Sequence, residues 1–202
     1  MSLIKKLNLE ELEKYSFQNK IPVIRPQSAQ LLYDTVHSLK PELILEIGTA
    51  VGFSGTIILK AAPINAFLTT IEKDKFRANY AKSIFSCHNL NNVQIIVNDA
   101  QVVLKDLVIK NSKFDFIFLD GPKGQYIKYL PMLKELLVNG GTLFCDNVNF
   151  QNFMFNNENS LKKFKTIIKN LKLFNSTVKD DKSLAVNFYD IEDGVAIIKK
   201  LS

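Results

Sequence analysis

The sequence predicts an α/β fold in which helices cover both faces of a mostly parallel sheet, with an antiparallel hairpin at one edge. Two observations support this prediction. Apolar runs alternate with helix-like segments from about residue 27 to residue 145, which is the pattern of repeated strand-helix units. Near the end of the chain, only a turn separates two short apolar segments. With 202 residues, the chain is expected to form one domain over 1–202, including a helical N-terminal segment at 1–40.

The elements are expected in a regular order. A helix over 27–40 has Ala29, Leu32, Val36 and Leu39 at helical spacing and ends before Pro41. Five strands are expected at 43–48, 67–74, 93–100, 114–121 and 141–148, with intervening helices at 54–62, 75–87, 101–108 and 125–137. The strand at 114–121 is almost continuously apolar, as expected for a strand covered on both faces. A helix at 160–172 then precedes hairpin strands at 183–190 and 194–200.

Composition limits the kinds of site. The net charge of +6 favours a polyanionic partner, but a Lys-, Asn-, Ile- and Phe-rich composition typical of AT-rich coding accounts for it equally well. Cys87 and Cys145 are the only cysteines, which suits a reducing compartment, and both are expected in or near the core. Because His37 and His88 lie in unrelated segments, a metal ion would have to be held by oxygen atoms.

Hydropathy predicts no association with membranes. No apolar run approaches the roughly 18–20 residues of a membrane span, and the charged N-terminus does not resemble a signal peptide. We therefore expect a cytoplasmic protein.

The glycine-containing segment EIGTAVGFS, from Glu46 to Ser54, follows the first strand. Gly48 and Gly52 would allow a tight turn and close approach of a ligand to the backbone. Their G-x-x-x-G spacing differs from the G-x-G-x-x-G of dinucleotide-binding turns, which disfavours a nicotinamide-dependent oxidoreductase. A tight turn without a ligand is the alternative.

Two further strands end in acidic residues. Glu72 lies about 20 residues beyond the glycine turn, where a carboxylate can bind both hydroxyls of a ribose, although it could equally be a solvated charge. Asp99 and Ala100 end the next strand and could contact an adenine edge. Asp99 could equally be the N-cap of the following helix.

A possible metal site follows the fourth and fifth strands. Asp120 ends one buried strand, and Asp146 and Asn147 end another. If these strands are neighbours, three oxygen ligands converge as a hard divalent cation requires. Lys123 lies three residues after Asp120, where a partly desolvated amine could act as a general base toward a hydroxyl. The alternatives are turn-capping acids and a surface lysine.

Taken together, LEIGTAVGFS, IEKD, NDA, FIFLDGPKGQY and GGTLFCDNV resemble the metal-dependent class I O-methyltransferases of the catechol and caffeoyl-CoA type. The resemblance covers roughly residues 21–148, and the final hairpin is in keeping with it. IPVIRPQS and DGPKGQY are most similar to the bacterial tRNA 5-hydroxyuridine methyltransferases, which form 5-methoxyuridine at the wobble position. After Val148 the chain departs from the family, reading NFQNFMFNNENS where a basic-Gly pair is usual.

The resemblance implies a Rossmann-like, seven-stranded methyltransferase sheet, S-adenosylmethionine as cofactor, Mg²⁺ or Mn²⁺, the tRNA anticodon loop as substrate and a homodimer. It implies cofactor-binding roles for Ile24, Gly48, Thr49, Ser54, Glu72, Asp99, Ala100, Gln101 and Asp120. It also implies metal ligands at Asp120, Asp146 and Asn147, with Lys123 as the general base beside Asp120.

Two other functions are alternatives for this sequence. One is a methyltransferase of small catechol-like phenols, which the lack of a long aromatic-rich lid segment disfavours. The other is a catalytically silent module that binds a ligand or RNA. The joint presence of Asp120, Lys123, Asp146 and Asn147 argues against the silent module, because a binding module needs no base beside a metal.

Overall fold

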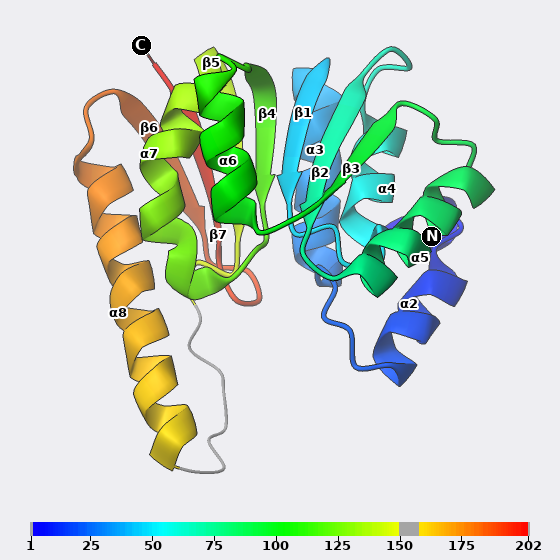
Figure 1. Ribbon diagram of the computed structural model, residues 1–202, viewed down its shortest axis with the longest axis horizontal. Helices are drawn as coiled ribbons and strands as arrows, with labels where there is room; N and C mark the ends of the chain where they lie inside the picture. The colour runs from blue at the N-terminus through cyan, green and yellow to red at the C-terminus, as the bar shows by residue number, and fades with distance from the viewer. Residues whose placement is uncertain (1, 150–157, 202) are drawn as a thin grey trace.

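A computed structural model describes residues 2–149 and 158–201 of the protein. These residues form a seven-stranded sheet in the order β3-β2-β1-β4-β5-β7-β6 (Figure 1). The strands are β1 (Leu43–Ile47), β2 (Phe67–Glu72), β3 (Val93–Val97), β4 (Phe114–Leu119), β5 (Leu137–Asp146), β6 (Leu184–Tyr189) and β7 (Val195–Lys200). The first five strands pair in parallel, and β7 is antiparallel to both β5 and β6. The predicted sheet and closing hairpin are confirmed.

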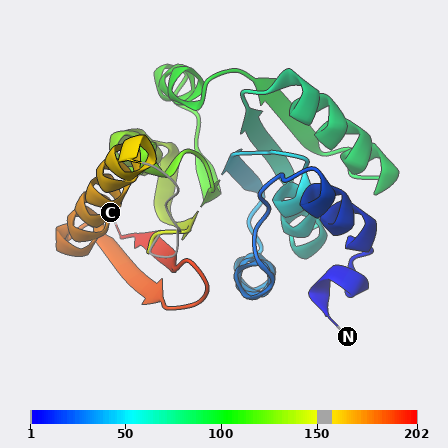
Figure 2. The same cartoon turned by 90° about the horizontal axis from the view of Figure 1, so that it is seen from below.

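The helices lie on both faces of this sheet. They are α1 (Leu3–Lys6), α2 (Glu10–Gln18), α3 (Pro26–Leu39), α4 (Phe53–Ala61), α5 (Lys75–Cys87), α6 (Ala100–Ile109), the 3₁₀ turn η1 (Lys123–Gln125), α7 (Tyr126–Leu136) and α8 (Glu158–Asp180). In Figure 1, α6 and α7 lie in front of the sheet and α3 and α4 behind it, and Figure 2 shows the same layers from below. None of the described helices is long and apolar enough to span a membrane.

Successive side chains of the central strands point to opposite faces of the sheet, and a separate hydrophobic core forms on each face. Phe116 and Phe118 of β4 pack with α1 to α5, whereas Ile117 and Leu119 pack with α6 to α8. All four side chains are fully buried. Because successive side chains of a strand point to opposite faces, a strand buried on both sides must be apolar throughout, as this segment is.

The N-terminal helices belong to the first of these cores. Leu3, Ile4, Leu9 and Leu12 are buried in the same cluster as residues of α3 and α4. The described segment 2–40 therefore packs in the core on this face, and it ends at the amino end of β1, whereas the glycine turn follows the carboxyl end of that strand.

Three expectations about local structure were wrong. Helix α8 continues eight residues beyond the predicted end at 172, because Phe174 and Val178 are buried against the sheet. Strand β5 begins at Leu137 rather than 141, with a register shift against β4 that accommodates the extra residues. Cys87, expected in or near the core, is exposed. The packed face of α5 is formed by Ala78, Ala81 and Phe85, and Cys87 lies off it.

Leu39, placed on the helical apolar pattern, is 48% exposed at the last position of α3. Most of the segment 149–160, where the sequence departs from the family, lies outside the described residues.

Candidate functional site

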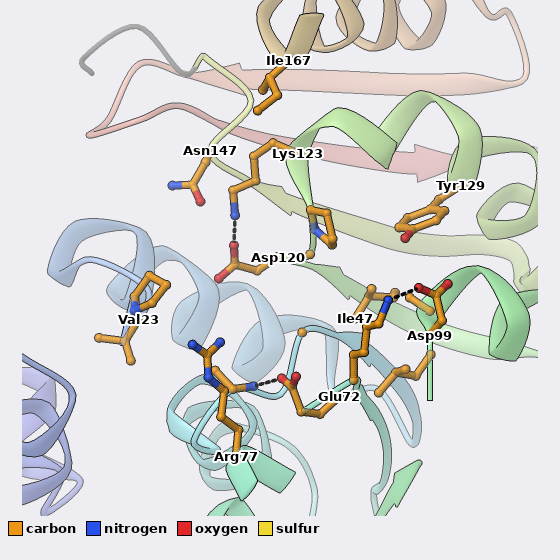
Figure 3. A pocket seen from close by; sticks show the side chains of 18 of the residues that line it. Val23, Ile47, Glu72, Arg77, Asp99, Asp120, Lys123, Tyr129, Asn147 and Ile167 are labelled. Carbon is orange, nitrogen blue, oxygen red and sulfur yellow. Dashed lines mark hydrogen bonds and ion pairs between the residues drawn. The ribbon is translucent and has the colours of Figure 1, made fainter. Parts of the chain in front are cut away.

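A cavity of about 550 Å³ lies at the carboxyl ends of β1, β2, β4 and β5. Between β1 and β4 the strand order reverses, and such a switch point leaves a crevice outside the strand ends. Figure 3 shows the side chains that converge there from separate elements. The predicted residues that line the cavity are Gly48, Glu72, Asp99, Ala100, Asp120, Lys123 and Asn147. The sheet therefore brings residues from all five predicted strand ends together at this cavity.

The turn after β1 forms the floor of the cavity. Gly48 has a φ of +105°, and a Cβ atom there would lie 2.5 Å from the carbonyl oxygen of Asp120. The turn is thus packed directly against the end of β4, and only glycine fits. The amides of Gly48 and Thr49 donate to the carbonyl of Ile71, at 3.0 and 3.2 Å, which joins the turn to β2.

A buried polar network lies beneath this turn. Glu46 is fully buried, and its two carboxyl oxygens accept hydrogen bonds of 2.6 Å from Ser54 and Thr70. The hydroxyls of Thr49 and Thr70 are also 2.6 Å apart. Burial raises the pKa of Glu46 to about 7, and the two hydroxyl donors oppose this shift. Ser54 and Thr49, which were predicted to hold the cofactor, are buried in this network and do not line the cavity.

Glu72 lies on the wall of the cavity at the end of β2. One carboxyl oxygen accepts a 2.8 Å hydrogen bond from the amide of Ala50, and the other accepts one of 2.8 Å from Asp74. These bonds fix the carboxylate beside the glycine turn. Each oxygen keeps a second lone pair, so the group can still accept hydrogen bonds from a pair of hydroxyls.

Asp99 acts as the N-cap of α6, which was the alternative interpretation of this residue. One of its oxygens accepts a 3.0 Å hydrogen bond from the amide of Gln101, and the other lies 3.2 Å from the ammonium of Lys73. The hydrogen bond from Lys73 lowers the pKa of Asp99. Ala100 borders the cavity, whereas Gln101 supplies the capped amide and does not. Ile24 is likewise buried in the core between its cavity-lining neighbours Val23 and Arg25.

The acidic end of the cavity joins β4 and β5. The Lys123 ammonium forms an ion pair with Asp120, and both side chains are 19% exposed (Figure 3). The Tyr126 hydroxyl lies 3.1 Å from the carbonyl oxygens of Leu119 and Asp146, which ties the two strand ends together. The neighbouring strands therefore bring Asp120, Lys123 and Asp146 to one place, as predicted.

Asp146 is itself almost completely buried, at 1% exposure. Burial, followed by the nearby charge of Asp120, raises its pKa to about 7, and Lys123 opposes the shift. The backbone N–H of Asn147 donates a 2.9 Å hydrogen bond to this carboxylate, and Asn147 has a left-handed backbone conformation with φ of +56°. A second carboxylate charge next to Asp120 is thus disfavoured unless positive charge is supplied.

The donor set fits a hard divalent cation. It consists of two carboxylates and one amide, and such oxygen donors suit Mg²⁺ or Mn²⁺. Within residues 2–149 and 158–201, no group of three or more His, Cys, Asp or Glu side chains could hold a metal. Asn147, which lines the same cavity, is the predicted third ligand.

Several cavity-lining residues were not predicted from the sequence. They include Val23, Arg25, Arg77, Tyr129 and Ile167. Tyr129 is 3% exposed and lies three residues after Tyr126 in α7, so both side chains are on the same face of the helix. This spacing was the signal in the sequence that could have identified it. Arg25 and Ile167 carry no local signal, because they reach the cavity only through the packing of α3 and α8 on the sheet.

The turn between β6 and β7 supports one side of the cavity. The Glu192 carboxylate accepts hydrogen bonds from the amides of Gln27 and Ser28, at 3.1 and 3.0 Å, and so caps α3. Asp193 pairs with Arg25 at 3.0 Å. These contacts bind the predicted IED turn to the start of α3, next to the cavity.

Comparisons with known proteins agree with this architecture. A model of the O-methyltransferase family matches residues 1–201. The chain is 27% identical to a caffeoyl-CoA O-methyltransferase of Stellaria longipes over 146 residues, which are 69% of this chain and 61% of that protein. It is 32% identical to a catechol O-methyltransferase of Niastella koreensis over 127 residues, which are 62% of this chain and 58% of that protein. The chain thus spans about three fifths of the length of each.

A solved structure with the same fold comes from Staphylococcus aureus, where the protein is provisionally described as a caffeoyl-CoA O-methyltransferase. It superimposes with a TM-score of 0.83 at 26% identity, covering 95% of this chain and 91% of that one. The similarity therefore extends over nearly the whole of both chains.

Proposed function

Because this chain belongs to the family of S-adenosylmethionine-dependent O-methyltransferases, we propose that its cavity binds that cofactor and transfers the methyl group to a substrate hydroxyl. The observation that carries the proposal is the convergence of Gly48, Glu72, Asp120, Lys123 and Asn147 on one cavity. Methyl transfer from a sulfonium is an in-line displacement, so catalysis depends mainly on holding the oxygen nucleophile close to the methyl carbon.

The cofactor would lie along the strand ends. The glycine turn at Gly48 would accommodate the methionine part, with Asp120 next to its amine. Glu72 would accept hydrogen bonds from the ribose hydroxyls. Asp99 and Ala100 would border the adenine, with Tyr129 on the same side of the cavity (Figure 3).

Asp120, Asp146 and Asn147 would hold Mg²⁺ or Mn²⁺. When bound, such an ion lowers the pKa of a substrate hydroxyl and orients it. Lys123 lies at the same end of the cavity, within hydrogen-bonding reach of Asp120. The ion pair favours the protonated ammonium, so Lys123 would act as the base only after it has released its proton and left Asp120; the neutral amine would then accept the hydroxyl proton as the methyl group is transferred.

The substrate that we propose is the 5-hydroxyl of 5-hydroxyuridine at the wobble position of tRNA. Helix α8 supports this choice, because Lys165, Lys169, Lys172 and Lys179 are exposed on it. At about 100° per residue these four positions fall within one side of the helix. Ile167 of the same helix lines the cavity and lies about 200° around the helix from Lys165, so these lysines are on the opposite side of α8, where they could contact an RNA backbone that extends beyond the site.

The alternative substrate is a small catechol-like phenol. The similarity to the Niastella koreensis catechol O-methyltransferase favours it. A catechol and a 5-hydroxyuracil both present a hydroxyl beside a second oxygen, so both can chelate the same cation. The two proposals differ in the substrate and share the chemistry of the site.

The test is mass spectrometry of nucleosides after incubation of the protein with S-adenosylmethionine, Mg²⁺ and tRNA containing 5-hydroxyuridine. We expect 5-methoxyuridine in the presence of Mg²⁺ and none with a chelator. The Asp146→Ala variant should lose turnover while binding the cofactor with nearly unchanged affinity. Methylation of a catechol but not of tRNA would contradict the RNA substrate, and turnover that survives the chelator would contradict the metal site.

A further inference from the structure

The two arginines of the chain both line the cavity. Arg25 and Arg77 are its only arginines, although Lys and Arg together number 26. They come from different elements: Arg25 precedes α3, and Arg77 lies in the first turn of α5. Arginine presents a planar fork of donors that matches a phosphate or carboxylate, whereas lysine is a flexible point charge. In a lysine-rich protein, this placement points to recognition of an anion.

Arg77 is distinguished by its lack of an acidic partner. Three other cations line the cavity in the described part of the chain, and each contacts a carboxylate: Arg25 pairs with Asp193, Lys73 with Asp99 and Lys123 with Asp120. Arg77 forms no ion pair within residues 2–149 and 158–201, although it is partly buried. Because no carboxylate neutralises this guanidinium, its donors are available to an anion that a ligand brings into the cavity.

The position of Arg77 is compatible with a ligand in the cavity. Figure 3 shows its side chain extending from α5 into the space beside Glu72. No ion pair joins Arg77 to Glu72 in the described part of the chain, and the two oxygens of that carboxylate accept backbone hydrogen bonds from Ala50 and Asp74. Arg25 is 52% exposed, so its remaining donors are also accessible while one nitrogen contacts Asp193.

We propose that Arg77, assisted by Arg25, binds a phosphate group of the substrate and so makes the site selective for phosphate-bearing hydroxyl substrates. The inference rests on the proposed methyltransferase function and names a property of the same cavity. A phosphate of this kind occurs in the RNA backbone next to the modified uridine and also in a coenzyme A thioester of a phenolic acid. Both offer the oxygen geometry that arginine binds with two parallel hydrogen bonds.

The experiment compares substrates that differ by a phosphate. Turnover is measured with 5-hydroxyuridine, its 5′-monophosphate and an anticodon stem-loop RNA that contains it. Arg77→Gln should lower kcat/KM about tenfold for the two phosphate-bearing substrates and leave the nucleoside unchanged. Arg77→Lys should be intermediate, because it keeps the charge and loses the fork. Arg25→Gln should act in the same direction.

The matched control is Lys82→Gln. Lys82 is exposed on the same helix α5 and does not line the cavity, so this variant removes one positive charge without altering the proposed site. We expect its kcat/KM to equal that of the wild type. Titration of the stem-loop RNA into protein loaded with S-adenosylhomocysteine gives the affinity independently of turnover. There, Arg77→Gln should reduce the salt dependence of binding by about one phosphate contact.

The outcomes separate this inference from the proposed function. An equal loss of kcat/KM for nucleoside and monophosphate, or a weakened affinity for S-adenosylmethionine, would assign Arg77 to another role and overturn the inference. Methylation of RNA by the wild type with an unaffected Arg77→Gln variant would also overturn it, while the RNA substrate would stand. If only phenols are methylated, caffeic acid and its coenzyme A thioester replace the nucleoside pair, and the same criterion decides.

Discussion

The buried carboxyl of Glu46 should make the stability of the protein depend on pH in a defined direction. Its pKa is raised from 4.5 to about 7 because burial penalises the charged form. In the unfolded chain the carboxyl ionises at its ordinary pKa, so between pH 4.5 and 7 the folded protein holds a proton that the unfolded chain releases. The contribution is therefore fully present below pH 4.5 and is lost as pH rises through 7.

The magnitude follows from the size of the shift. A shift of roughly 2.5 pKa units, at about 1.4 kcal/mol per unit, corresponds to about 3 kcal/mol of unfolding free energy. The variant Glu46→Gln has no ionisable group at this position. Its amide can still bond to Ser54 and Thr70, because the hydroxyls of Thr49 and Thr70 can exchange their donor and acceptor roles.

The assay is urea unfolding of the wild type and of Glu46→Gln at a series of pH values from 4.5 to 8. The unfolding free energy of the wild type relative to the variant should fall by about 3 kcal/mol between pH 4.5 and 7.5 and then become constant. Asp146 also titrates near pH 7, but it is present in both proteins, so its contribution cancels in the difference. A difference that stays constant within about 0.5 kcal/mol would refute the reasoning.

Three further predictions concern other parts of the site and the fold. Lys123→Met should reduce kcat by on the order of 10²- to 10⁴-fold with little change in cofactor affinity, and steady-state kinetics with a wild-type rate would reject its role as base. Gly48→Ala should destabilise the protein by at least about 1–3 kcal/mol in denaturant unfolding, because its φ is +105° and its Cβ would collide with the backbone of Asp120; an unchanged midpoint would contradict the packing of the turn. A thiol reagent should modify Cys87 in the native protein and Cys145 only after unfolding, because Cys145 is buried and its pKa is raised by that burial; rapid labelling of both thiols would be inconsistent with the fold.

The polar residues at the strand ends could be predicted because they follow directly from the strand pattern. A buried parallel strand is an apolar run, and its carboxyl end is the place where polar residues can meet a ligand. Glu72, Asp120 and Asn147 were identified in this way and all line the cavity. The helix-capping role of Asp99 was also predictable, because an acidic residue immediately before a helix has a local function in any fold.

The hydrogen-bond partner of Ser54 could not be predicted from the strand pattern. The sequence places Ser54 just after the glycine turn, which suggests contact with a ligand. Its hydroxyl instead donates to Glu46, and which way it points depends on the packing of α4 on the sheet. The length of α8 is a similar case, because Asn175, Ser176 and Thr177 are weak helix formers and the burial of Phe174 and Val178 holds that turn in place.

By itself, then, the sequence determined the alternation of strands and helices, the glycine turn and the polar residues at the strand ends, since each of these depends on residues close together in the chain. Only the tertiary structure decided which distant segments meet. The hydrogen bond from Gln27 to Glu192 joins residues 165 positions apart, and the pairing of Arg25 with Asp193 depends on the same contact. The meeting of Arg25 and Arg77 at one cavity likewise requires the order of the strands in the sheet, which no local pattern encodes.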